Sequence, residues 1–498
     1  MQITGNYLAI LPIVILLTGA IIGLLIRQHR RLQEGWSFAV IVMAFISSLI
    51  LLSQVWRGGQ PFVYHIGGWS APFGISIVAD LLSTTMVMMS LLVISAGILY
   101  ALGCKDIVTE YPTFYPLFLL LALGLTGGLL TGDLFNLFVF AELMVISATI
   151  LTAISDDKKG VEAAYKYFYI SLIAGVFLLL SVGALYASYG SLNIADLANR
   201  IQINPDLPLV PMAIVFMLAF FMVKSAVVPF HFWQPDFHTA APTPVHAVLS
   251  SVVVKLGIYG FLRMSTLLFI DQMDVAKIVL IFLGIVGIFF GGLGATATYD
   301  AKRMLAYSTL GQLGFILVGI GWGSSLALVA VIVYSFNHSL LKASMLMLAG
   351  TVSSRSPAKT AAFSEITGLG KVVPISGILF LLGGMGLAGI PPMNGFISKF
   401  FLVKSGVEAG EYLPLALLLL GSIITLVYVI RAYQKIWWIP LPKSVKPKPY
   451  GDMFLAPAIL IGLSIVLGIW CEPLLQLAEA TVSSMSIPTE YILAVLGD

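Results

Sequence analysis

The stretch "FMVKSAVVPFHFWQPDFHTAAPTPVHAVLSSVVVKLGIYG" (residues 221–260) places two lysines, three histidines and four prolines in a strongly apolar region. A second stretch, "GLAGIPPMNGFISKFF" (residues 386–401), again combines an apolar run, a proline interruption and a lysine. Proline removes a backbone N–H donor and clashes with the preceding helical turn. Both stretches therefore predict a helix that is broken part-way across a membrane, where only protein or water can satisfy the freed backbone groups.

The composition around these stretches indicates an all-α polytopic membrane protein. Hydrophobic residues make up 59% of the 498 residues and charged residues only 10%, which is more apolar surface than a soluble domain can bury. Apolar runs long enough to cross the hydrocarbon core predict about fourteen transmembrane helices in one continuous domain, residues 1–498. They lie near residues 6–26, 37–55, 77–101, 113–131, 133–154, 163–188, 209–235, 244–269, 276–296, 303–322, 326–350, 372–407, 413–433 and 454–472.

Basic residues predict the orientation of the chain in a cell membrane. The first apolar run has no basic residues before it and is followed by Arg27, Arg30 and Arg31, as expected for a retained first span with its N-terminus outside. Alternation from there puts most of the 26 Lys and Arg residues on the cytoplasmic side and the C-terminus outside. The formal net charge of +3 then reflects topology, and we expect no nucleic-acid partner.

The two broken helices also predict an internal repeat. Lys224 precedes Pro229, whereas Lys399 follows Pro391 and Pro392, and the predicted seventh and twelfth spans cross in opposite directions. Two units of inverted topology produce this reversed order in many ion transporters. We therefore expect two five-helix repeats, at about residues 113–269 and 276–433, flanked by helices in residues 1–101 and 454–472.

The sequence predicts neither a cofactor nor a metal. The two cysteines, Cys104 and Cys471, fall on opposite sides of the predicted membrane, so a disulfide, a zinc site or an iron–sulfur cluster is not expected. The sequence also lacks the P-loop pattern of nucleotide-driven pumps. We therefore expect a transporter driven by an ion gradient or by a partner, and not an enzyme.

Charged side chains well inside predicted spans are costly and usually mark an ion or proton path. In this chain they are Glu142, Lys224, Lys255, Lys342, Lys399 and Lys404. Glu142 needs a cationic partner from another span, and we expect Lys224; the alternative is a buried ion pair that only holds two helices together. Lys404 lies nearer a span end and is interpreted as structural. Asp80, close to an interface, is left open.

The remaining buried groups predict a proton relay. Lys255 lies in mid-span beside Ser250 and Ser251, while His338 and Lys342 are four residues apart and share one helix face. Imidazole can pass a proton in both directions near neutral pH. The alternative for His338 is a hydrogen-bonded packing residue. Lys399 would take up or release the proton at the far end.

Polar residues of the opening stretch are candidate proton-uptake groups on the cytoplasmic side. They are His231, His238, His246 and Asp236. We expect His238 in a connection and His246 in the first turn of the eighth span, with Thr243 as its cap and Pro244 in its first position. The alternative is a set of merely solvated side chains, and their spacing fits no zinc template.

Several motifs together resemble the antiporter-like membrane subunits shared by respiratory complex I and the multisubunit Mrp (Mnh) cation/proton antiporters. They are "LTGDLFNLFVFAELMVIS", "KSAVVPFHFWQPDFHTAAPTPV", "VVKLGIYGFLR", "KRMLAYSTLGQLGFILVGI", "NHSLLKASMLMLAG" and "GIPPMNGFISKFFLVKSGVEAG". The segments "GNYLAILPI" and "GGWSAPFGISIVADL" are most similar to the D-type subunit of the Mrp antiporters. The resemblance implies fourteen helices, inverted repeats and broken seventh and twelfth helices.

The resemblance also implies roles for single residues. Glu142 matches the key glutamate of the fifth helix and Lys224 its paired lysine. Lys255 and Lys399 match the lysines of the eighth and twelfth helices, and His338 and Lys342 fall at linking positions.

An Mrp-type subunit would exchange Na⁺, or alternatively K⁺ or Li⁺, for protons beside sibling membrane subunits that include a larger antiporter-like one. "PFHFWQPDFHTAAPTPV" is more similar to the complex I version, and His246 replaces a usually small residue. A proton-pumping subunit of a redox-driven complex is therefore the alternative function, and a scaffold without transport is a third.

Overall fold

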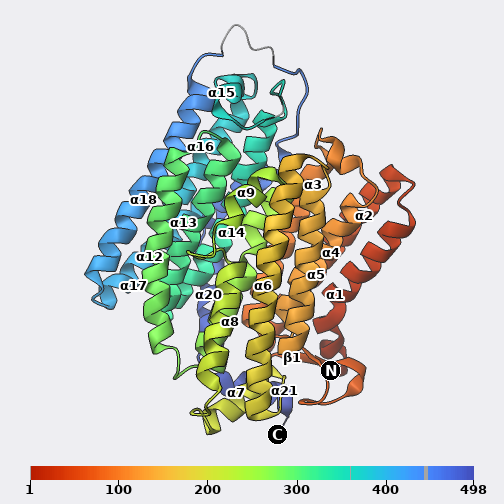
Figure 1. Ribbon diagram of the computed structural model, residues 1–498, viewed down its shortest axis with the longest axis vertical. Coiled ribbons are helices and arrows are strands. Elements are labelled where there is room, and N and C mark those ends of the chain that lie inside the picture. The colour runs from red at the N-terminus through yellow and green to blue at the C-terminus, as the bar shows by residue number, and fades with distance from the viewer. Residues whose placement is uncertain (1, 359, 442–446, 498) are drawn as a thin grey trace.

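The chain folds into a bundle of long helices that run mostly along one direction (Figure 1). The computed structural model describes residues 2–358, 360–441 and 447–497. Both chain termini lie at the same end of the bundle, beside the short elements β1, α7 and α21 (Figure 1). The predicted all-α membrane fold is confirmed.

The first half of the chain supplies one flank of the bundle. A two-stranded antiparallel hairpin, β1 (Phe62–His65) with β2 (Ser76–Ala79), lies at the end that carries the termini. The helices are α1 (Gln2–Leu25), α2 (Arg30–Gly58), α3 (Leu81–Leu102), α4 (Phe114–Leu130), α5 (Leu134–Ala153), α6 (Lys158–Tyr189) and α7 (Ile194–Ile203).

The third predicted span begins later than the sequence indicated. Residues 76–79 form strand β2, and helix α3 starts only at Leu81. Asp80 explains the difference, because its side chain accepts a hydrogen bond of 2.9 Å from the backbone N–H of Ser83 and caps the helix. The prediction of a helix from residue 77 was wrong by these four residues.

The rest of the chain supplies the centre and the other flank. Its helices are α8 (Val210–Lys224), α9 (Trp233–Ala240), α10 (Thr243–Val248), α11 (Lys255–Arg263), α12 (Asp274–Ala297), α13 (Ala301–Trp322), α14 (Ser325–Ser353), α15 (Phe363–Ile366), α16 (Pro374–Ala388), α17 (Asn394–Glu408), α18 (Tyr412–Tyr433), α19 (Leu455–Ile469), α20 (Glu472–Met485) and α21 (Pro488–Leu496).

The two predicted helix breaks are present. Helix α8 ends at Lys224 and the chain resumes as α9 at Trp233, while α16 ends at Ala388 and α17 begins at Asn394. Gly389 follows α16 with a φ of +88°, a conformation that favours glycine. A Cβ on Gly389 would also press on the side chain of Lys399. The break therefore makes room for the lysine beside it.

Within the described residues, ten helices are long and apolar enough to cross a membrane, and two bent pairs could raise the number to twelve. Helices α4 and α8 are apolar but shorter. Every one of the fourteen predicted ranges contains a helix, and the number of complete crossings stays a prediction.

Burial divides the bundle into a centre and a periphery. Helices α13 and α14 and the segment Thr243–Leu268 are almost completely buried, whereas α1, α12 and α18 expose much of their apolar surface. Exposed Val, Ile, Leu and Phe side chains are what a lipid-facing surface requires. Lys255, His338 and Lys342 on these central segments are fully buried and thereby shielded from lipid on all sides.

Candidate functional site

Lys255 and His338 meet at the centre of the bundle. The Nζ atom of Lys255 and Nδ1 of His338 are 2.6 Å apart, and both side chains are fully buried. A π-helical turn, Leu249–Val253, ends two residues before Lys255, and the lysine also donates to the carbonyl oxygen of Ser251 at 3.1 Å. Such turns often occur at functional sites. The partner of His338 is thus on another helix.

Lys342 lies one helical turn from His338 and makes its contacts with helix α13. It donates to Ser308 Oγ at 2.7 Å and to the carbonyl oxygen of Leu305 at 3.2 Å. The hydroxyl of Ser308 is in turn 2.6 Å from that of Tyr428 on α18. Polar contacts therefore continue from α14 through α13 to α18.

A parallel set of contacts joins the same three helices. The Tyr334 hydroxyl donates to Gln312 Oε1 at 2.7 Å, and Gln312 Nε2 donates to Thr425 Oγ1 at 3.3 Å. These residues, and the pair of Ser308 and Tyr428, were not predicted from the sequence. The available signal was the polar pair Ser308 and Gln312, four residues apart and so on one face of the predicted span 303–322.

Lys399 is held at the second helix break. Its Nζ donates to the carbonyl oxygen of Ala388 at 3.1 Å and to Ser422 Oγ at 3.0 Å. The same Nζ lies 4.4 Å from the centroid of the Phe315 ring, within the range of a cation–π interaction. A cavity of about 220 Å³ adjoins this lysine.

Glu142 and Lys224 form no ion pair. Within the described part of the chain, no salt bridge of 4.0 Å or less joins them, and the buried atoms Lys224 Nζ and Glu142 Oε1 have no hydrogen-bond partner. Glu142 packs on α6, where a Cβ on Gly175 would lie 3.0 Å from Oε1. The partnership of Glu142 with Lys224 therefore stays a prediction.

The candidate proton-uptake groups fall into two sets. His238 and His246 are buried with ring centroids 5.2 Å apart, and their ring nitrogens have no hydrogen-bond partner within the described residues. His238 lies within α9, so its predicted place in a connection was wrong. Thr243 was expected as the cap of the next helix but is the first residue of α10, and Pro242 before it makes no side-chain capping bond. The half-buried His231 instead packs at 4.3 Å on the ring of Phe290.

Asp236 is an ion-pair hub at the surface. One carboxylate oxygen lies 3.1 Å from Lys166 and the other 3.1 Å from Arg303. The carboxylate thus links α6, α9 and α13, and it does not contact the two buried histidines in any hydrogen bond that the described residues form.

Two further charged groups have structural contacts. Lys404 is exposed and lies 3.9 Å from Glu408 on its own helix. Asp80 is buried and forms a 2.6 Å ion pair with Arg263. Among the residues that the structure describes, no cluster of three or more His, Cys, Asp or Glu side chains is placed to hold a metal ion.

Comparison with known proteins identifies the family. The family model described as NADH:quinone oxidoreductase/Mrp antiporter, TM, matches residues 131–425. The chain is 32% identical to the D-type subunit of the Na(+)/H(+) antiporter of Alkalihalophilus pseudofirmus, over 99% of this chain and 100% of that protein. It is 33% identical to the N-type subunit of the NADH-quinone oxidoreductase of Desulforudis audaxviator, over 94% and 97% of the two chains.

A solved structure agrees with these relatives. A chain of the Mrp complex from Dietzia sp. superposes with a TM-score of 0.90 at 26% identity, over 99% of this chain and 100% of that one. The resemblance noted from the sequence motifs is confirmed. This chain belongs to the family of NADH:quinone oxidoreductase/Mrp antiporter membrane subunits.

Proposed function

We propose that the chain is the D-type subunit of a multisubunit Na⁺/H⁺ antiporter and carries protons along its row of buried charged side chains. The full-length similarity to the D-type subunit of such an antiporter supports the assembly. The observation that carries the transport role is the contact between Lys255 and His338, 2.6 Å long and shielded from both water and lipid. The proposed partners are the sibling membrane subunits, and K⁺ or Li⁺ could replace Na⁺.

The contact supports proton transfer because either nitrogen can hold the shared proton. A charged lysine donates to neutral Nδ1, and a charged imidazole donates to the neutral amine. A proton on the histidine would leave from Nε2, which is buried and has no partner in the described structure. Lys342 and its contacts with Ser308 and Tyr428 continue the path toward α18.

Glu142 and Lys224 would set the direction of transfer. When the two approach, the positive charge of Lys224 is compensated, and when they separate, its proton is more easily given to the next group. Steps between groups that do not touch need water. Buried polar atoms without partners, such as Asn337 Oδ1 and the side-chain atoms of Asn394, are the kind that ordered waters satisfy.

Lys399 is the proposed terminal group, which would take up or release the proton, and a mostly apolar cavity adjoins it. In this proposal the two broken helices belong to inverted repeats, residues 113–269 and 276–433, and both termini lie outside the cell. His238 and His246 remain the candidate uptake groups.

Proton flux in vesicles that contain the whole complex tests the proposal. Lys255→Met should remove the relay and most of the Na⁺-driven flux, because methionine keeps the size of the side chain and loses its charge. Lys404→Met is the matched control, since that lysine is exposed and contacts only Glu408 among the described residues. Unchanged flux in a fully assembled Lys255→Met complex would contradict the proposal.

A redox-linked proton pump is the second candidate. The similarity to the N-type subunit of an NADH-quinone oxidoreductase, 33% identical over nearly the full length, favours it. Copurification separates the two: iron–sulfur partners would support the redox assembly, and a larger antiporter-like partner without them would support the antiporter.

A further inference from the structure

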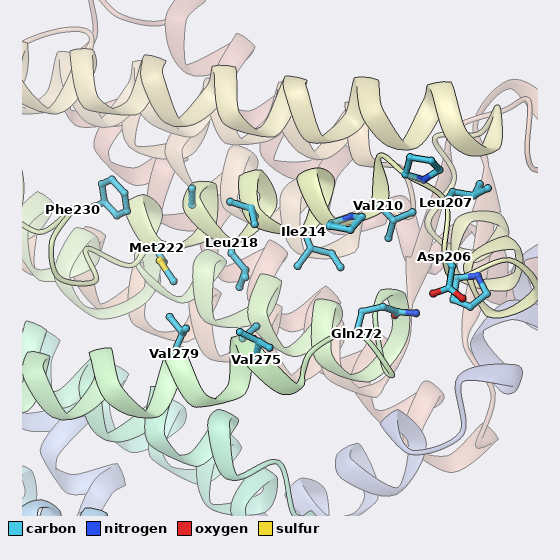
Figure 2. A pocket seen from close by; sticks show the side chains of 16 residues that line it. Asp206, Leu207, Val210, Ile214, Leu218, Met222, Phe230, Gln272, Val275 and Val279 are labelled. Carbon is cyan, nitrogen blue, oxygen red and sulfur yellow. The ribbon is translucent and has the colours of Figure 1, made fainter.

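A long groove lies between helices α8 and α12, away from the row of charged residues (Figure 2). Its volume is about 690 Å³, and its walls are almost entirely apolar, including Ile214, Leu218 and Val279. Asp206 is the single charged residue among those that line it, and it lies at one end together with Gln272 (Figure 2). The other end is formed by Met222 and Phe230.

The groove spans the depth of one membrane leaflet. Its wall on α8 extends from Val210 to Met222, which corresponds to about 18 Å along a helix axis. One leaflet contributes about half of the ~30 Å hydrocarbon core. The polar end lies where α8 and α12 begin, at the end of the bundle that carries both termini (Figure 1). The apolar end stops at the break after Lys224.

The shape and chemistry of the groove suit a lipid chain. It is long and apolar, it lies between two helices that expose apolar side chains, and its one charged residue is at an end. An acyl chain with a polar headgroup has the same arrangement of one polar end and a long apolar part.

We propose that this groove binds one acyl chain of a phospholipid with an ammonium headgroup, taken from the leaflet on the side of the termini. The carboxylate of Asp206 supplies the charge complementarity, and no ion pair occupies it among the described residues. A phosphatidylethanolamine headgroup places its ammonium at that depth. An anionic headgroup without an amine would meet the carboxylate with like charge.

The position of the groove lets a bound lipid contact the break between α8 and α9. The end of its acyl chain packs on Met222, near the end of α8, and on Phe230, one of the eight residues between α8 and α9. This is the segment that must shift if Lys224 moves relative to Glu142. The bound lipid thus restrains the first broken helix from the membrane side.

Native mass spectrometry of the intact purified complex, with lipid analysis, tests this site. Ala219→Phe would fill the groove, because Ala219 lines it, while Ile278→Phe enlarges a residue of α12 that is 68% exposed and lies outside the groove. We expect the wild type and Ile278→Phe to retain one phosphatidylethanolamine per chain through detergent washing, and Ala219→Phe to lose it. Equal retention by Ala219→Phe would overturn the site.

The headgroup is tested separately in lipid discs with known mixtures of phosphatidylethanolamine and phosphatidylglycerol. Asp206→Asn should lower the preference for phosphatidylethanolamine about fivefold, the equivalent of one ion pair near the surface, while a chain is still bound. Asp271→Asn, on a neighbouring loop and not lining the groove, should keep the preference. An unchanged preference in Asp206→Asn would overturn the headgroup assignment.

A photo-crosslinking amino acid at position 275 identifies the occupant directly, because Val275 lines the groove and is 75% exposed. Crosslinks to phospholipid support the proposal. Crosslinks to a sibling subunit in place of lipid would overturn it.

Discussion

Two carboxylates and the cations assigned to them differ in their contacts: Asp80 with Arg263, and the half-buried Glu142 with Lys224. Asp80 and Arg263 are joined at 2.6 Å, and the guanidinium also lies 5.0 Å from the rings of Tyr259 and Tyr491. Glu142 and Lys224 form no ion pair, and one buried atom of each, Glu142 Oε1 and Lys224 Nζ, has no hydrogen-bond partner among the described residues. The charges of Asp80 and Arg263 are therefore compensated by direct contacts. Glu142 and Lys224 lack such contacts and are free to form new ones.

The difference separates a structural role from a functional one. A buried pair with complete hydrogen bonding holds its helices together, and removing one partner leaves an uncompensated charge. A pair with unmet hydrogen bonds costs stability as it stands, so stability does not explain why it is present. We infer that the Asp80–Arg263 pair fixes the end of the bundle near the termini and that Glu142 and Lys224 serve transport.

The largest expected effect is on stability. Arg263→Met leaves the Asp80 carboxylate buried without a cation, and we expect the free energy of unfolding to fall by about 3–5 kcal/mol. Thermal denaturation of the purified complex measures this loss. Tyr491→Phe is a mild control, because it keeps the ring that faces Arg263. A loss no larger than in the control would contradict the structural role.

The loss of proton flux should depend on which side-chain contact of a relay lysine is removed. His338→Leu takes away the group that shares the 2.6 Å contact with Lys255, so we expect proton flux in vesicles to fall by about tenfold or more, in the range by which positioned proton-transfer groups act. Ser422→Ala should have a smaller effect, because Lys399 keeps its bond to the Ala388 carbonyl. Equal losses of proton flux in the two variants would contradict a special role for the contact between Lys255 and His338.

Acid should remove the stability that the ion pair of Asp80 with Arg263 contributes, within a definite pH range. Burial raises the pKa of the Asp80 carboxyl, but Arg263 and hydrogen bonds from Ser83 outweigh it and hold the pKa below its ordinary value. Its contribution to stability is therefore complete above the unfolded pKa of about 3.9 and is lost as the pH falls through the lower folded pKa.

Melting curves of the wild type and Asp80→Asn between pH 6 and 3 measure this contribution. The stability difference between the two should shrink only below about pH 4. A difference that already disappears well above that pH would contradict the assignment.

The smallest effect tests the freedom of Glu142. Gly175→Ala adds a Cβ 3.0 Å from Glu142 Oε1 and 3.2 Å from the Phe138 ring, which should displace the carboxylate and reduce flux a few-fold. Gly183→Ala is the matched control on the same helix, because its Cβ would meet no atom within 4 Å. Equal flux in the two variants would show that the position of Glu142 is not critical.

The sequence predicted those parts of the molecule that depend on local chemistry. Apolar runs located the helices, and the prolines located both breaks, because each acts within a few residues. The start of α3 was misplaced, since hydropathy does not register the cap that Asp80 provides. His338 was matched by spacing to Lys342, whereas its contact is Lys255, 83 residues away. Such long-range contacts, like that of Ser308 with Tyr428, depend on packing that no local pattern encodes.

The most direct test of the central claim measures stability and flux together in two matched variants. Each of Asp80→Asn and Glu142→Gln replaces one of the two carboxylates by its isosteric amide in the intact complex. We predict that Asp80→Asn lowers the melting temperature and that its folded fraction still exchanges Na⁺ for protons, whereas Glu142→Gln melts like the wild type and loses exchange. A Glu142→Gln complex that is destabilised but transports normally would contradict the account.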